Sequence, residues 1–146
     1  MREVAEETGL PVEHLVTDPE SEGLAVGVTL FVVGVGLGTV QAARRAVARV
    51  QSGPGVIGYV TDLARATRVS PSFQLGVSPR GSTALLNTAK AWAWLNGRDF
   101  TTPDDVQAMT LPCLRHRVSL RPEAELDGVS ADQVLSGLLA TVPVPR

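Results

Sequence analysis

From about residue 39 onward, the apolar positions of the chain recur at the three- and four-residue spacing of amphipathic helices. A first stretch of this kind covers residues 40–50. A second covers residues 56–67, after the Gly53-Pro54-Gly55 sequence, which is typical of a break between elements. Its apolar stripe consists of Val56, Ile57, Val60, Leu63, Ala64 and Thr67. Each stretch predicts a helix with one buried face.

The longest predicted helix begins at Ser78, a good capping residue. Pro79 takes the first helical position, where its missing N–H costs nothing. Asn96-Gly97 is expected to end the helix. The pattern predicts that one face enters the core, and Trp94 falls on the outer side. The residues expected on the core face are Leu85, Leu86, Ala89, Trp92 and Ala93.

Two further helices complete the pattern. One begins at Thr102, with Pro103 and two acids in its first turn, at the positive end of the helix dipole. Pro112 is expected to bend or split this helix, because its ring clashes one turn back. Ser130 and Gln133 form a capping box for the last helix. About five helices with short connections predict an all-α bundle over residues 39–146.

Residues 1–38 have a different character and receive no domain assignment. Residues 1–22 hold seven acids and one arginine without a clear apolar face, which favours a weakly ordered tail. Residues 23–43 carry no charge and could cross a bilayer, but their glycines and β-branched run favour a buried or irregular segment. A membrane span stays open as the alternative. A phosphate-binding loop requires a lysine directly after its glycines, and none follows the glycines of this segment.

Composition and charge narrow the function classes. One cysteine, Cys113, cannot form an internal disulfide, which agrees with a cytoplasmic protein, and its apolar neighbours predict a buried, inert thiol. His14 and His116 are far apart in the sequence, so no metal site is expected. The bases lack the clustering and aromatic interleaving of a nucleic-acid interface, so nucleic acid is not an expected partner.

Five short motifs between residues 77 and 129 occur in a recognisable order. They are Val77-Ser-Pro-Arg-Gly-Ser82, Ala91-Trp-Ala-Trp-Leu-Asn-Gly-Arg-Asp99, Thr102-Pro-Asp-Asp-Val106, Leu114-Arg-His-Arg-Val118 and Pro122-Glu-Ala-Glu-Leu-Asp-Gly-Val129. On these motifs, the chain from about Thr39 to Arg146, about three-quarters of its length, resembles the C-terminal helical lid of MoxR-type AAA+ ATPases. In that family the lid packs over the nucleotide that its own core domain binds.

The resemblance implies a hexameric ring that remodels or activates partner proteins, often ones with von Willebrand A domains. The expected partners of this chain are therefore an AAA+ core domain and neighbouring ring subunits. The resemblance also assigns Ser78 and Arg80 to nucleotide binding, with Arg80 as the second-sensor arginine that reports on the γ-phosphate. ATP and Mg²⁺ are the implied cofactors of a complete enzyme. The phosphate loop and the Mg²⁺-binding acids are missing here, so no ATP hydrolysis is expected from the chain alone.

The physics of the helix start agrees with the assignment of Arg80. A helix N-terminus offers free N–H donors and a positive dipole end, so a base there is unfavourable unless an anion or another group compensates. The plain alternative is a solvated arginine at a helix end. For the chain as a whole, the alternative is a non-catalytic all-α interaction module, tethered to a membrane if residues 23–43 span one.

Overall fold

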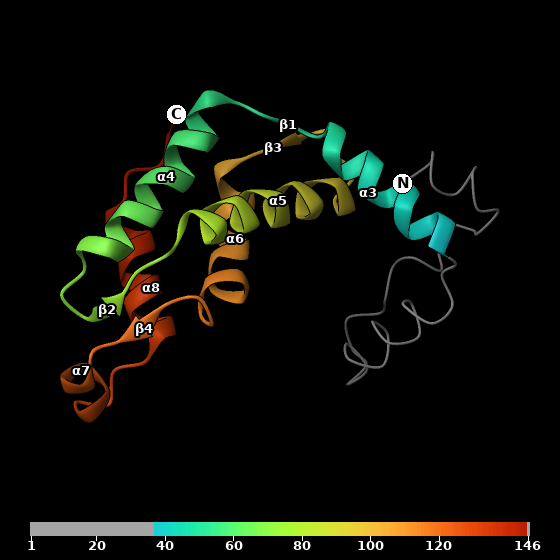
Figure 1. Ribbon diagram of the computed structural model, residues 1–146. Helices are drawn as coiled ribbons and strands as arrows, with labels where there is room; N and C mark the ends of the chain where they lie inside the picture. The colour runs from blue at the N-terminus through green and yellow to red at the C-terminus, as the bar shows by residue number, and fades with distance from the viewer. Residues whose placement is uncertain (1–36, 146) are drawn as a thin grey trace, which may run out of the picture. The chain divides into compact units, whose positions relative to one another are not determined.

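The computed structural model describes residues 37–145 (Figure 1), which belong to two units that meet between Arg49 and Val50. Of the first unit the structure describes helix α3 (Leu37–Arg49), which confirms the helix predicted at residues 40–50. The predictions for the acidic tail and for most of the apolar segment lie outside the described residues. Within residues 37–145 no helix is long and apolar enough to cross a membrane.

The second unit contains the remaining helices and confirms the predicted all-α class. The helices are α4 (Pro54–Val69), α5 (Pro79–Leu95), α6 (Pro103–Leu114), α7 (Pro122–Leu126) and α8 (Ala131–Thr141). The sequence patterns predicted four of these, and the five-residue α7 is the addition. Four of the five begin at a proline, whose fixed φ suits the first turn of a helix.

Two pairs of very short strands tie the connecting segments together. Strand β1 (Gln51–Ser52) runs parallel to β3 (Phe100–Thr101), which joins the segments that precede α4 and α6. Strand β2 (Phe73–Leu75) lies antiparallel to β4 (Ser119–Leu120), which joins the α4–α5 connection to the segment before α7. These pairs fix where α5 and α6 begin.

The core lies among α4, α5, α6 and α8, and α5 packs mainly against α6 (Figure 1). The most deeply buried large side chains are Leu85, Leu114, Leu135, Val77 and Val106. Along α5 the buried positions are Gly81, Leu85, Ala89 and Ala93, one every four residues. Three of these four residues are small, so α6 can approach α5 closely along this line.

Two predictions about side chains need correction, and one about a helix break is narrowed. Trp92, expected in the core, is 40% exposed, whereas Trp94, expected outside, is half-buried. Ile57 is exposed, and Tyr59 takes the buried place beside Val56 on α4. Of the two outcomes predicted at Pro112, a bend or a split, the structure excludes the split, because α6 continues for two residues beyond the proline.

Candidate functional site

The start of α5 is the part of the fold on which the sequence placed a function. Ser78 caps the helix as predicted: its Oγ accepts from the N–H of Gly81 at 3.2 Å, and its carbonyl accepts from the N–H of Ser82 at 3.1 Å. Pro79 has no N–H to offer. Among the first-turn residues Pro79–Ser82, Arg80 is therefore the one whose N–H has no partner found within residues 37–145. The hydroxyl proton of Ser78 also remains available for donation.

Arg80 is exposed at this helix start. Within the described part of the chain, no carboxylate or carbonyl is found paired with its guanidinium. The first turn of α5 contains no acid either. A cation at the positive end of a helix opposes the helix dipole, and nothing in residues 37–145 offsets that cost. The structure thus brings the two predicted residues, Ser78 and Arg80, together on one exposed turn.

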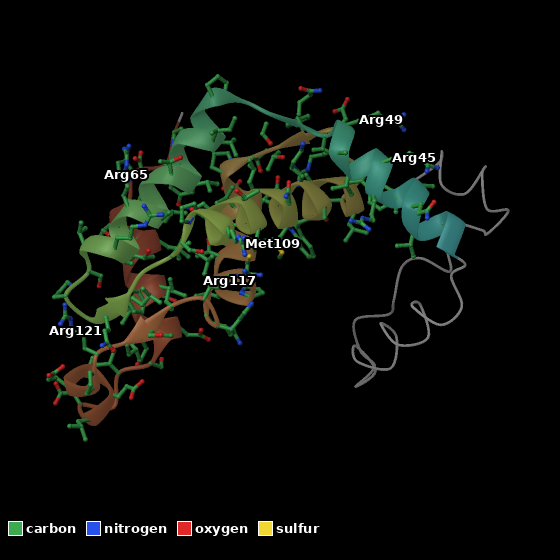
Figure 2. All side chains as sticks on the ribbon, in the orientation of Figure 1. Arg45, Arg49, Arg65, Met109, Arg117 and Arg121 are labelled. Carbon is green, nitrogen blue, oxygen red and sulfur yellow. The ribbon has the colours of Figure 1, made fainter. Side chains whose placement is uncertain are left out.

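Two more arginines reach the same turn from other elements. Arg68, near the end of α4, donates from Nε to the carbonyl of Val77 at 2.8 Å. Arg117 follows α6, where Figure 2 labels it, and donates from Nε to the carbonyl of Cys113 at 3.0 Å. Its Cδ lies 3.7 Å from the place where a Cβ on Gly81 would sit. No Asp or Glu is found paired with Arg68 or Arg117 in residues 37–145, so three arginines lie around this turn without a paired acid in that part of the chain.

The turn itself is tightly seated against α4. The N–H of Val77 donates to the hydroxyl of Thr67 at 2.9 Å, and Thr67 is only 2% exposed. A Cβ on Gly76 would lie 2.7 Å from the Cα of Arg68, so no other residue fits there without a backbone shift. A Cβ on Gly81 would meet the side chain of Val77 at the same distance. The backbone of the turn that carries Arg80 is therefore held by close contacts with α4 and with the Val77 side chain.

A second charged site, which the sequence analysis missed, lies at the start of α6. Arg98 makes two hydrogen bonds to the carboxylate of Asp105, at 2.7 and 2.5 Å, and the Asp105 side chain is only 3% exposed. The N–H and hydroxyl of Thr102 also donate to Asp105, at 2.8 and 2.9 Å. Burial acts to raise the pKa of Asp105, but the hydrogen bonds from Arg98 and Thr102 outweigh it and lower that pKa.

This second site is structural in character. The guanidinium of Arg98 also lies over the ring of Phe100, 5.9 Å from its centroid, and donates to the Phe100 carbonyl. The hydrogen bond to Asp105 raises the pKa of Arg98, so the pair stays charged. The Asp105 carboxylate is buried and accepts four hydrogen bonds from Arg98 and Thr102, which leaves little of it for a ligand to bind. The pair fastens the end of α5 to the start of α6.

The other residues considered as candidates, Arg115 and Cys113, show no arrangement that suits ligand binding. Arg115, in the motif of residues 114–118, pairs with Asp132 of α8 at 3.1 Å, and both side chains are about half exposed. Cys113 is buried, as predicted. In residues 37–145 no three His, Cys, Asp or Glu side chains gather in a way that could hold a metal ion.

The chain matches the family model of the AAA lid domain over residues 65–138, about half of its length. It therefore belongs to the AAA lid domain family, and its helical unit is a lid of the MoxR type. It is 37% identical over 116 residues to the protein MoxR of Paracoccus denitrificans, covering 67% of this chain and 34% of that one. The chaperone MoxR1 of Mycobacterium tuberculosis is 32% identical over 100 residues, with coverages of 62% and 26%.

Further comparisons agree. The protein YeaC of Bacillus subtilis is 40% identical over 102 residues, covering 70% of this chain and 32% of that protein. The crystal structure of a candidate ATPase from Cytophaga hutchinsonii matches with a TM-score of 0.70 at 27% identity, over 75% of this chain and 36% of that chain. The chain thus spans about a third or less of the curated relatives it matches.

Proposed function

We propose that this chain supplies the C-terminal lid of a MoxR-like AAA+ ATPase and that Arg80 serves in it as the second-sensor arginine. The observation that carries the proposal is the start of α5. There an exposed arginine without a partner in residues 37–145 stands at a positive helix end, beside two further arginines. Such an arrangement is unfavourable by itself and gains stability when an anion binds.

The anion that this arrangement suits is the phosphate chain of ATP. A guanidinium can form two parallel hydrogen bonds to phosphate oxygens. The N–H of Arg80 and the hydroxyl of Ser78 add two neutral donors on the same turn. Charge that builds up on the transferred phosphoryl group is stabilised by a cation fixed in advance, and loss of the γ-phosphate would release the lid.

The rest of the ATP site has to come from a core domain. Phosphoryl transfer needs a phosphate loop and carboxylates for Mg²⁺, and we assign both to an AAA+ core outside this lid. Neighbouring ring subunits are the other expected partners. By analogy with the chaperone MoxR1, the assembly acts on other proteins. The resemblance to MoxR-type ATPases suggests that it remodels or activates them, and we assign it to the cytoplasm. Proteins with von Willebrand A domains are our candidates for that client.

The test joins this lid to the core domain of a MoxR-like ATPase and compares Arg80→Ala with the parent enzyme. We expect turnover at saturating ATP to fall about tenfold or more, because a charge-assisted contact to phosphate contributes about 1.5–3 kcal/mol. Arg80→Lys should restore only part of the activity, since a point charge cannot replace the planar fork. Folding should not suffer.

Arg121→Ala is the matched control. Figure 2 places Arg121 where β4 leads into α7, away from the start of α5. Its backbone N–H bonds the Ser72 carbonyl, and that bond survives the substitution. Turnover of this variant should equal that of the parent. Equal activity of the parent and Arg80→Ala would reject the sensor assignment and leave the bundle as an interaction module.

A further inference from the structure

We propose that Thr67 and Arg68, at the end of α4, are positioning residues for Arg80. The inference rests on the proposed function of Arg80 and extends it to a second helix. The evidence is the pair of hydrogen bonds that hold Val77, the residue just before the helix cap. Thr67 accepts from the Val77 N–H at 2.9 Å, and Arg68 donates to the Val77 carbonyl at 2.8 Å. Both polar groups of one peptide residue are thus bound by adjacent residues of α4.

The hydroxyl of Thr67 is well oriented to hold the Val77 N–H. Its hydroxyl is buried and makes two bonds at once: it donates to the Ala64 carbonyl at 2.8 Å and accepts from Val77. The first bond fixes the direction of the hydroxyl proton, so the lone pairs point at the Val77 N–H. Valine has nearly the same shape but cannot accept, and it would leave that buried N–H without a partner.

The end of α4 is closely packed against the segment that leads into α5. Gly76 lies against the backbone of Thr67 and Arg68, where a Cβ would come within 2.7 Å of main-chain atoms. On the other side of Val77, its own side chain packs against Gly81 in the first turn of α5. A shift of the end of α4 must therefore move Val77, and Val77 moves the turn that carries Arg80. Close-packed contacts of this kind transmit displacement instead of absorbing it.

Arg68 would be a costly choice for a merely structural contact. Its guanidinium adds a second cation near Arg80 and the positive end of α5, which raises the repulsion there. An uncharged donor would hold the same carbonyl without that penalty. The penalty disappears when a polyanion occupies the turn. The end of α4 is therefore arranged to bring Arg80 into register with bound phosphate, and to lose that register when phosphate leaves.

The test is a double-mutant cycle in the joined lid–core enzyme. Arg68→Ala and Thr67→Val are each made with Arg80 present and with Arg80→Ala. With Arg80 present, each should lower kcat about threefold to tenfold, with a smaller change in KM, since residues in one contact network couple by this much. In the Arg80→Ala background the same substitutions should change kcat less than twofold. Thr67→Ser keeps the hydroxyl and should retain the parental kcat.

Arg65→Ala is the matched control on the same helix. Figure 2 shows Arg65 on the side of α4 away from α5, and its partner is the exposed Asp62, 3.4 Å away. This variant should keep parental kcat in both backgrounds. Thermal melts of the chain accompany every variant. If Thr67→Val does not fold, Arg68→Ala still completes the cycle, because Arg68 is an exposed residue.

The outcomes separate the two proposals. Equal losses of kcat in both backgrounds would show that the α4 residues support the bundle without acting through Arg80, and would overturn this inference alone. Parental kcat in Arg68→Ala and in Thr67→Val would overturn it as well. If Arg80→Ala by itself leaves turnover unchanged, the sensor assignment fails first and this inference fails with it.

Discussion

Helices α5 and α6 begin with the same device and then diverge. Each has a hydroxyl residue at its cap and a proline at its first position. Helix α6 continues with Asp104 and Asp105, the charges that the positive helix end favours. Helix α5 continues with Arg80, the charge that it disfavours. The positive end of α6 is therefore compensated by its own acids, whereas the positive end of α5 is open to an anion from outside the bundle.

The two arginines show the same contrast. Arg98 has both arms on one buried carboxylate and a ring beside its plane. Arg80 is exposed, and no partner is found for it in residues 37–145. An arginine that has no paired acid and stands at the positive end of a helix lowers the stability of the fold. Stability accounts for Arg98, and the proposed nucleotide contact accounts for Arg80.

The largest effect on stability should come from Asp105→Ala. The substitution removes the partner of Arg98 and the acceptor for Thr102 in one step. We expect a loss of about 2–4 kcal/mol in the free energy of unfolding, somewhat less than the roughly 3–5 kcal/mol lost when a fully buried pair is broken, because Arg98 is partly exposed. Urea unfolding followed by tryptophan fluorescence measures it, since both tryptophans lie on α5.

Asp62→Ala is the control for that experiment. It breaks the Arg65–Asp62 pair, whose side chains are 73% and 57% exposed. Exposed pairs contribute little, so the loss should stay below about 0.5 kcal/mol. Similar losses in the two variants would mean that the Arg98–Asp105 pair is not the structural fastening that we describe.

A smaller effect should appear as a pH dependence. Asp105 has a lowered pKa in the folded protein, so its carboxylate contributes stability that is fully present above the unfolded pKa, about 4. That contribution is lost as the pH falls through this value toward the folded pKa. Asp105→Asn should flatten the loss of stability between about pH 5 and pH 3. Parallel curves for the parent and Asp105→Asn would contradict the assignment.

The smallest predicted effect on stability comes from exchanging the charges at the starts of α5 and α6. Arg80→Glu should stabilise the bundle by about 0.3–1 kcal/mol, and Asp104→Arg should destabilise it by a similar amount. Thermal melts at low salt would measure both changes, which should shrink as salt is added. If Arg80→Glu instead lowers the melting temperature, Arg80 has a structural role and the contrast between the two helices is lost.

Much of the fold could be predicted from helix periodicity, caps and prolines, and the errors have physical causes. Trp92 shares the helical spacing of Leu85 and Ala89, which predicts a place on the core face. The close approach of α6 selects small residues for the buried line of α5, so Ala89 and Ala93 are buried and Trp92 is left partly exposed. The buried face of α4 is turned toward Tyr59 and away from Ile57. The Tyr59 hydroxyl accepts a hydrogen bond from the Gln107 side-chain amide at 3.1 Å while its ring is buried.

The candidate site was predicted only as far as local sequence reaches. Ser78, Pro79 and Arg80 are adjacent in the sequence, so the helix start that they share could be predicted. The contacts of Val77 with Thr67 and Arg68 join residues nine and ten positions apart, and no local pattern indicates them. Asp105 looked like an ordinary first-turn acid. Arg98, seven residues earlier, was the signal that a bidentate pair could form across the loop.

The prolines that begin α4, α5, α6 and α7 also act before the chain has folded. Each ring holds φ near the helical value even in the unfolded ensemble. Part of the backbone entropy that folding usually removes is therefore already absent at Pro54, Pro79, Pro103 and Pro122. A proline of this kind stabilises by about 0.4–1 kcal/mol without any contact in the native state. Replacing the exposed Pro122 by alanine would leave the folded structure intact and still make the bundle easier to unfold.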